Sequence, residues 1–79
     1  MKESQRQLIW QANKMFNAAY EVGLVAVNDQ SFQTQANELE RQAHQLVRAA
    51  GYPDGPTFEL SAWCAQVCTD YESGRLQVS

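Results

Sequence analysis

Three residues of this chain are of types that ligate metals or act as nucleophiles: Cys64, Cys68 and the single histidine, His44. Four residues apart on a helix, the two cysteines have Cβ atoms about 5–6 Å apart, whereas a disulfide needs roughly 3.5–4.5 Å. With His44 they supply three of the four ligands that a structural zinc site normally has. A thiol or zinc enzyme built on them is the weakest function considered, and we interpret both cysteines as small core residues.

His44 is expected on the polar face of its helix, in line with Glu40 and Arg48. It then belongs to a solvated row and not to a cysteine–histidine pair, because a core thiol does not reach the outer face of a helix. The sequence contains no glycine-rich phosphate loop, G-x-S-x-G motif or H-E-x-x-H motif. We predict that the protein is not an enzyme and uses no cofactor or metal.

Two tryptophans indicate contacts with another protein. Trp10 falls opposite the apolar face of its predicted helix, beside Lys14, and a large exposed ring marks such contacts. The alternative is that the C-terminal tail covers Trp10. Trp63 lies at the margin of the apolar face of the last helix, where it either joins the core or centres a binding strip.

Trp63 lies in a row of polar side chains, two of them acidic, on the last predicted helix. Glu59, Gln66 and Asp70 share a helix face with it. Asp70 and Glu72 lie near the helix end, where the macrodipole favours cations by about 0.3–1 kcal/mol per charge. Acidic residues at this end therefore oppose the helix dipole. They either serve only to keep the protein soluble or form an acidic end that meets a basic patch on a partner. The predicted partner-binding residues are Trp10, Lys14, Glu59, Trp63, Gln66, Asp70 and Glu72.

The formal net charge of the 79-residue chain is −3. Residues 1–48 hold five basic and five acidic side chains, so the acidic excess falls in residues 49–79, which hold four acids and Arg75. Nucleic-acid binding requires the opposite, a cluster of Lys and Arg, so we expect no direct contact with DNA or RNA. With neither a long apolar run nor a signal-peptide pattern, we expect no membrane partner, and a cytoplasmic protein with reduced cysteines.

Apolar residues recur at steps of four and three in three segments, which is the spacing of one helix face. The rows run from Leu8 to Ala26, from Phe32 to Ala50 and from Leu60 to Tyr71. They predict three helices, over about residues 5–27, 29–50 and 58–73. In an alternative, residues 24–27 form a short extended connector.

Capping residues set the predicted starts of these helices. Ser4 and Gln7 form a capping box for the first, Asn28 caps the second, and Thr57 caps the third. Val27 and Phe32 are placed as a hydrophobic staple.

Two glycines and a proline-rich turn set the predicted ends. Gly51 and Gly74 are left-handed stops after the second and third helices. Residues 52–56, with the sequence Y-P-D-G-P, form a rigid turn between those helices.

The sequence therefore predicts an all-α fold, a small antiparallel three-helix bundle in a single domain over residues 1–79, with a short tail at 74–79. Alanine takes half of the positions in the first two rows, so the core is thin. A chain of this size is near the lower limit for a self-sufficient core, and homodimerisation is one way to complete it.

Two classes of function follow. The first is a non-enzymatic protein-binding module. Its sharpest form is a small acidic inhibitor of the phage or mobile-element type, with an anti-CRISPR or anti-restriction role. It would dock on a basic surface of a larger, nucleic-acid-handling host protein. The alternative is a structural or assembly subunit that acts through its own helical oligomer.

Overall fold

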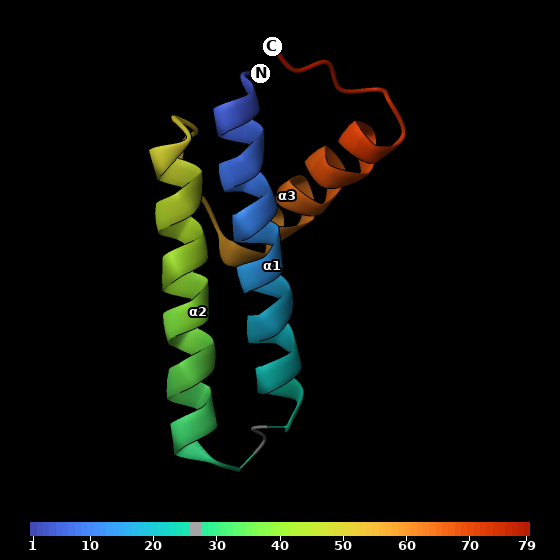
Figure 1. The fold of residues 1–79 in the computed structure, drawn as a ribbon. Coiled ribbons are helices and arrows are strands. Elements are labelled where there is room, and N and C mark those ends of the chain that lie inside the picture. The colour runs from blue at the N-terminus through green and yellow to red at the C-terminus, as the bar shows by residue number, and fades with distance from the viewer. Residues whose placement is uncertain (26–27) are drawn as a thin grey trace.

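The computed structural model describes residues 1–25 and 28–79, which form three α-helices and no strand. α1 spans Glu3–Val25, α2 spans Gln30–Ala49 and α3 spans Thr57–Glu72. α1 and α2 pair as an antiparallel hairpin, and α3 rises obliquely past α1 (Figure 1). The all-α three-helix bundle predicted from the sequence is confirmed.

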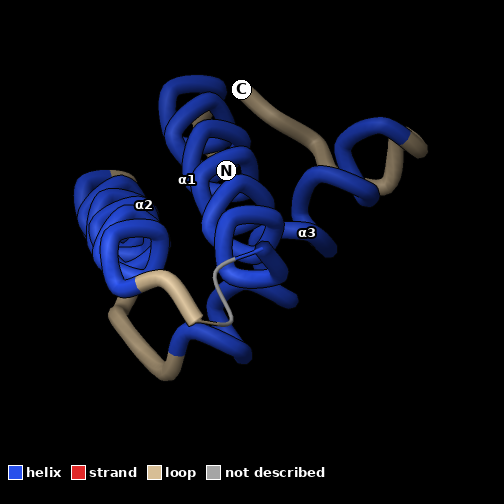
Figure 2. Tube along the Cα trace, turned by 90° about the horizontal axis from the view of Figure 1, so that it is seen from below, coloured by secondary structure: helices blue, strands red, loops and turns tan. Residues whose placement is uncertain are grey.

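α1 is the central helix, because it lies between α2 and α3 (Figure 2). The direction of α1 opposes both neighbours, since the loop after α2 turns back along the hairpin before α3 begins (Figure 1). Among the residues that the structure describes, none of the helices has the length and apolar character to cross a membrane.

The main core lies where all three helices meet. Ile9, Val47 and Cys64, one from each helix, are its largest fully buried side chains. Half of its other buried members are alanines, in keeping with the thin core that the sequence predicts. The other buried members of this core are Ala12, Phe16, Ala43, Ala50, Leu60 and Val67.

The hairpin end away from α3 is thinly packed, so the apolar rows are not buried along their whole length. α3 has 16 residues and α1 has 23, lengths of about 24 and 35 Å at about 1.5 Å per residue. α3 therefore covers only part of α1. Near the uncovered end, Phe32 is 40% exposed although its row predicts burial, and Tyr71 at the opposite end of the molecule is 38% exposed.

α1 begins two residues earlier than predicted, and Ser4 lies inside it. The cause is a contact that the local sequence does not reveal. The backbone N–H of Glu3 donates to the carbonyl of Ser79 at 3.0 Å, and Ser79 N–H donates to the carbonyl of Met1 at 3.2 Å. The two ends of the chain therefore lie together (Figure 1). The predicted short tail also contributes to packing, because Leu76 lies against the core.

Two of the predicted N-caps are wrong by one residue. Asp29, not Asn28, caps α2, because its carboxylate accepts the Ser31 backbone N–H at 2.9 Å. Pro56 precedes α3, so Thr57 is its first helical residue. The predicted staple involves Val27, which lies outside the described residues.

The predicted glycine stops are confirmed. Gly51 and Gly74 have φ angles of 91° and 77°, which side-chain-bearing residues rarely adopt. Each lies two residues after the last residue of its helix, Ala49 of α2 and Glu72 of α3. Leu24 and Val25 are helical, while the rest of the alternative connector, residues 26–27, is not described.

Candidate docking site

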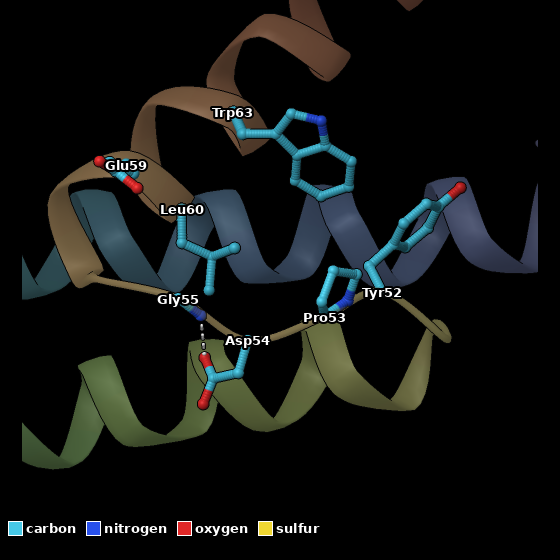
Figure 3. Close-up of a pocket in the computed structure, with 7 residues that line it drawn as sticks. All are labelled: Tyr52, Pro53, Asp54, Gly55, Glu59, Leu60 and Trp63. Carbon is cyan, nitrogen blue, oxygen red and sulfur yellow. Dashed lines mark hydrogen bonds between the residues drawn. The ribbon is translucent and has the colours of Figure 1, made fainter.

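A pocket of about 400 Å³ opens between the loop after α2 and the start of α3. We call it the aromatic pocket. Figure 3 shows Tyr52, Pro53 and Trp63 to one side of Leu60, and Glu59 to the other. Its lining residues are Tyr52, Pro53, Asp54, Gly55, Glu59, Leu60 and Trp63.

Tyr52 and Trp63 form the aromatic wall of this pocket. Their ring centres are 4.9 Å apart and their planes are tilted by 55°, within the range of favourable aromatic pairs. Both rings are half-buried against the core. Leu60, which also lines the pocket, belongs to that core and is 8% exposed. The wall is therefore anchored from behind and open in front.

The loop that carries Tyr52 is held at several points. The Gln5 side-chain amide on α1 donates to the carbonyl of Ala50 at 2.9 Å. The N–H of Tyr52 donates to the carbonyl of Val47 at 3.3 Å, which Gly51 permits by its positive φ. Two prolines fix further φ angles in the same loop. Tyr52 is thus placed before any ligand arrives.

His44 joins this loop to both neighbouring helices, an arrangement we call the His44 clasp. From α2, its Nδ1 lies 2.6 Å from Asp54 Oδ1 and its Nε2 lies 2.8 Å from Thr57 Oγ1. Its ring also meets Phe16 edge-on, with centres 5.5 Å apart. The same order of carboxylate, imidazole and hydroxyl orients nucleophiles in hydrolases. Here its structural effect is to fix the loop.

The His44 clasp overturns two predictions. His44 does not belong to a solvated row with Glu40 and Arg48, because the loop after α2 turns back and covers its ring. Thr57 does not cap α3, because its hydroxyl bonds with His44. Both results depend on the path of the loop, which helix periodicity does not specify.

The carboxylate of Asp54 is held in its charged form. Hydrogen bonds from His44 and from the Gly55 N–H lower its pKa, and the nearby charges of His44 and Arg48 add to the effect. Because Asp54 is compensated from the α2 side, Glu59 is the acidic group that remains at the outer rim of the aromatic pocket.

Cys64 is in the core, as interpreted from the sequence, whereas Cys68 is only partly buried and does not belong to the core cluster. Cys64 is fully buried, and burial raises its pKa to about 11. Burial and the charge of Glu72 raise the pKa of Cys68. The thiolate is the nucleophilic and metal-binding form. Within the described residues, no three His, Cys, Asp or Glu side chains gather to hold a metal ion.

The predicted site residues are divided among several places. Glu59 and Trp63 line the aromatic pocket. Trp10 lies apart on α1, is 43% exposed and carries the Lys14 ammonium 4.2 Å from its ring centre. Of the two predicted alternatives for Trp10, exposure is the one observed.

The remaining predicted residues continue along α3. The Gln66 side-chain amide donates to Asp70 at 2.9 Å. Asp70 also lies 4.0 Å from Arg75, which returns past Gly74 to the end of the helix and offsets part of the unfavourable acidic charge there. Glu72 is exposed.

Sequence reasoning missed five residues of the aromatic pocket: Tyr52, Pro53, Asp54, Gly55 and Leu60. The Y-P-D-G-P segment indicates a rigid turn, and an aromatic residue at its start is the one signal that was present. Nothing in the local sequence places Tyr52 against Trp63, eleven residues later. Comparison of the chain with protein-family models, with curated proteins and with solved structures finds no match.

Proposed function

We propose that this chain is a non-enzymatic protein-binding module that docks on a larger protein through the aromatic pocket. One observation carries the proposal: the Tyr52 and Trp63 rings, 4.9 Å apart, wall an open pocket of about 400 Å³. Tyr and Trp dominate binding energies at interfaces when they lie in well-packed pockets. Because the backbone around Tyr52 is already fixed, little conformational entropy remains to be lost on binding.

The charge of the chain favours a basic partner. Glu59 stands at the rim of the aromatic pocket, and Asp70 and Glu72 follow along α3. Opposite surface charge accelerates association and selects against acidic partners. A net charge of −3 is too small to imitate duplex DNA, which carries one charge per about 1.7 Å, so the pocket must supply the specificity.

In its finer form, the proposal is an inhibitor of the phage or mobile-element type. It covers a basic surface of a nucleic-acid-handling host enzyme, as an anti-CRISPR or anti-restriction role requires. The small size of the chain and the acidic excess in residues 49–79 support this form. Trp10 with Lys14 supplies a second contact patch on α1.

A second candidate function, a subunit that assembles with itself, is favoured by a different surface. Tyr20, Leu24, Val25 and Phe32 lie near the hairpin end and are 69, 61, 74 and 40% exposed. The molecule exposes 5268 Å², against about 4,800 Å² for a compact monomer of its mass. This excess fits a face that a second copy covers.

Affinity capture with matched variants tests the docking proposal. Trp63→Leu removes one wall of the aromatic pocket. Phe58→Ala is the control, because Phe58 is an exposed ring on the same helix, outside the pocket. Circular dichroism checks that both variants fold. The wild type and Phe58→Ala should capture the same host protein.

With the captured partner purified, Trp63→Leu should weaken binding by about 2 kcal/mol or more, which is about thirtyfold in Kd. A partner that binds folded Trp63→Leu as tightly as the wild type would show that the aromatic pocket is not the docking site. Sedimentation distinguishes docking from the second candidate function. An obligate oligomer that dissociates only when it unfolds would favour the self-assembling subunit.

A further inference from the structure

We infer that the aromatic pocket binds a cationic side chain of the partner, and that this side chain is an arginine. The inference rests on the proposed function and names the chemistry of the group that enters the pocket. Four observations carry it: two cation–ring pairs elsewhere on the chain, the charges on the pocket lining, the apolar middle of the pocket and its size.

Two other partly exposed rings in the described residues already have a cation from the same chain. Arg6 lies over Tyr71, with its guanidinium carbon 4.1 Å from the ring centre. Lys14 lies over Trp10 at 4.2 Å. The ring face attracts a cation, and this attraction grows as water is excluded. A positive charge thus covers the exposed rings of Trp10 and Tyr71, whereas the other exposed rings of the described residues, Tyr20, Phe32 and Phe58, have no such pair.

No Lys or Arg side chain of the described residues lines the aromatic pocket, so the lining supplies no cation for its two rings. Its charged lining residues are Asp54 and Glu59, both carboxylates. His44 and Arg48 act on Asp54 from the side of α2, so Glu59 is left to meet an incoming charge. Glu59 precedes Trp63 by one helical turn and lies across Leu60 from the two rings, so it borders the other side of the pocket (Figure 3). A positive group from outside completes this arrangement.

The shape and lining of the pocket favour a long side chain with a planar charged head. Leu60 and Pro53 offer apolar surface to an aliphatic stem, which arginine and lysine bury while the head stays polar. The guanidinium is planar, stacks on aromatic rings and pairs with carboxylates through two N–H groups, whereas ammonium is a strongly hydrated point charge. A volume of about 400 Å³ accommodates one such side chain.

Nuclear magnetic resonance of the two indole N–H groups tests the inference on the intact protein. The probes are N-acetyl-arginine amide, the lysine equivalent, and two neutral controls, the citrulline and leucine amides. The arginine probe should shift the Trp63 signal saturably and bind about tenfold more tightly than citrulline, the size of a cation–ring contact with an added ion pair. Trp10 provides an internal control in the same spectrum.

Charge removal at the rim supplies the matched variants. Glu59→Gln should weaken arginine binding about threefold. Glu21→Gln, which removes an exposed acid on α1, should leave it unchanged. The inference is overturned if citrulline or leucine binds as well as arginine, if lysine binds more tightly, if Glu59→Gln has no effect, or if no probe moves the Trp63 signal.

The outcomes also separate this inference from the proposed function. Loss of the captured partner with Trp63→Leu, together with an indole that ignores arginine, would keep the docking site and reject the cationic anchor. If the Trp63 indole binds arginine while Trp63→Leu keeps full partner affinity, the pocket binds arginine but is not the docking site.

Discussion

Replacing Ile9 by alanine tests where the stability of the molecule resides. Ile9 is fully buried in the core where the three helices meet. The substitution removes three carbon atoms, worth about 2.4 kcal/mol at roughly 0.8 per methylene, and the cavity adds to this. We expect a loss of about 3 kcal/mol. For 79 residues the total stability is of order 4–12 kcal/mol, so the loss is a large fraction of it.

Leu24→Ala is the matched control, because it also shortens an aliphatic side chain of α1. Leu24 is 61% exposed near the hairpin end that α3 does not cover. Its replacement should change stability by no more than about 0.5 kcal/mol. Urea unfolding followed by circular dichroism at several protein concentrations measures both variants.

Equal losses for Ile9→Ala and Leu24→Ala would refute the placement of the core at one end. A Leu24→Ala loss that appears only at high protein concentration would instead indicate that a second copy covers the hairpin end. An Ile9→Ala variant as stable as the wild type would show that α3 does not pack on α1 as the structure has it.

Further predictions concern the backbone, the His44 clasp and the core thiol. Gly23→Ala should stabilise the protein by about 0.5–1 kcal/mol, because Gly23 is helical with open space around it. Gly51→Ala should destabilise the protein by at least about 1 kcal/mol, because the φ of Gly51 is positive. Urea unfolding measures both changes. The Asp54 carboxyl should titrate below 3.8 by carbon NMR and return toward that value in His44→Gln. Since that pKa is lowered by folding, Asp54 should contribute stability above about pH 4, and this contribution should disappear as the pH falls through the depressed pKa, which comparison with Asp54→Asn across pH would show. Cys64, with a pKa of about 11, should react with alkylating reagents at neutral pH only after unfolding, and equally fast labelling of the native protein would contradict its burial.

The His44 clasp and the Tyr52–Trp63 wall show why the candidate site was only half predicted. Trp63 and Glu59 were found because they share one helix face, and a helix face can be read from spacing alone. Tyr52 was not found, because its partner lies on another element. His44 was assigned to solvent for the same reason, since helical projection shows the outer face of α2 but not the loop that covers it.

Local sequence determined the three helices and the C-terminal stops of α2 and α3. Four–three spacing creates an apolar face in each segment, and the positive φ at Gly51 and Gly74 needs a residue without Cβ. These properties depend on residues within a turn or two of one another.

Tertiary structure alone decided which part of the hairpin α3 covers, where the loop after α2 runs and which rings meet. Such choices arise from packing between residues distant in sequence, and many paths of a loop satisfy the same helical pattern. The alanine-rich rows of α1 and α2 bring two helices together along their length, but they do not state where a third helix rests on them. That placement buries Ile9, Val47 and Cys64 together and leaves the aromatic pocket open beside them.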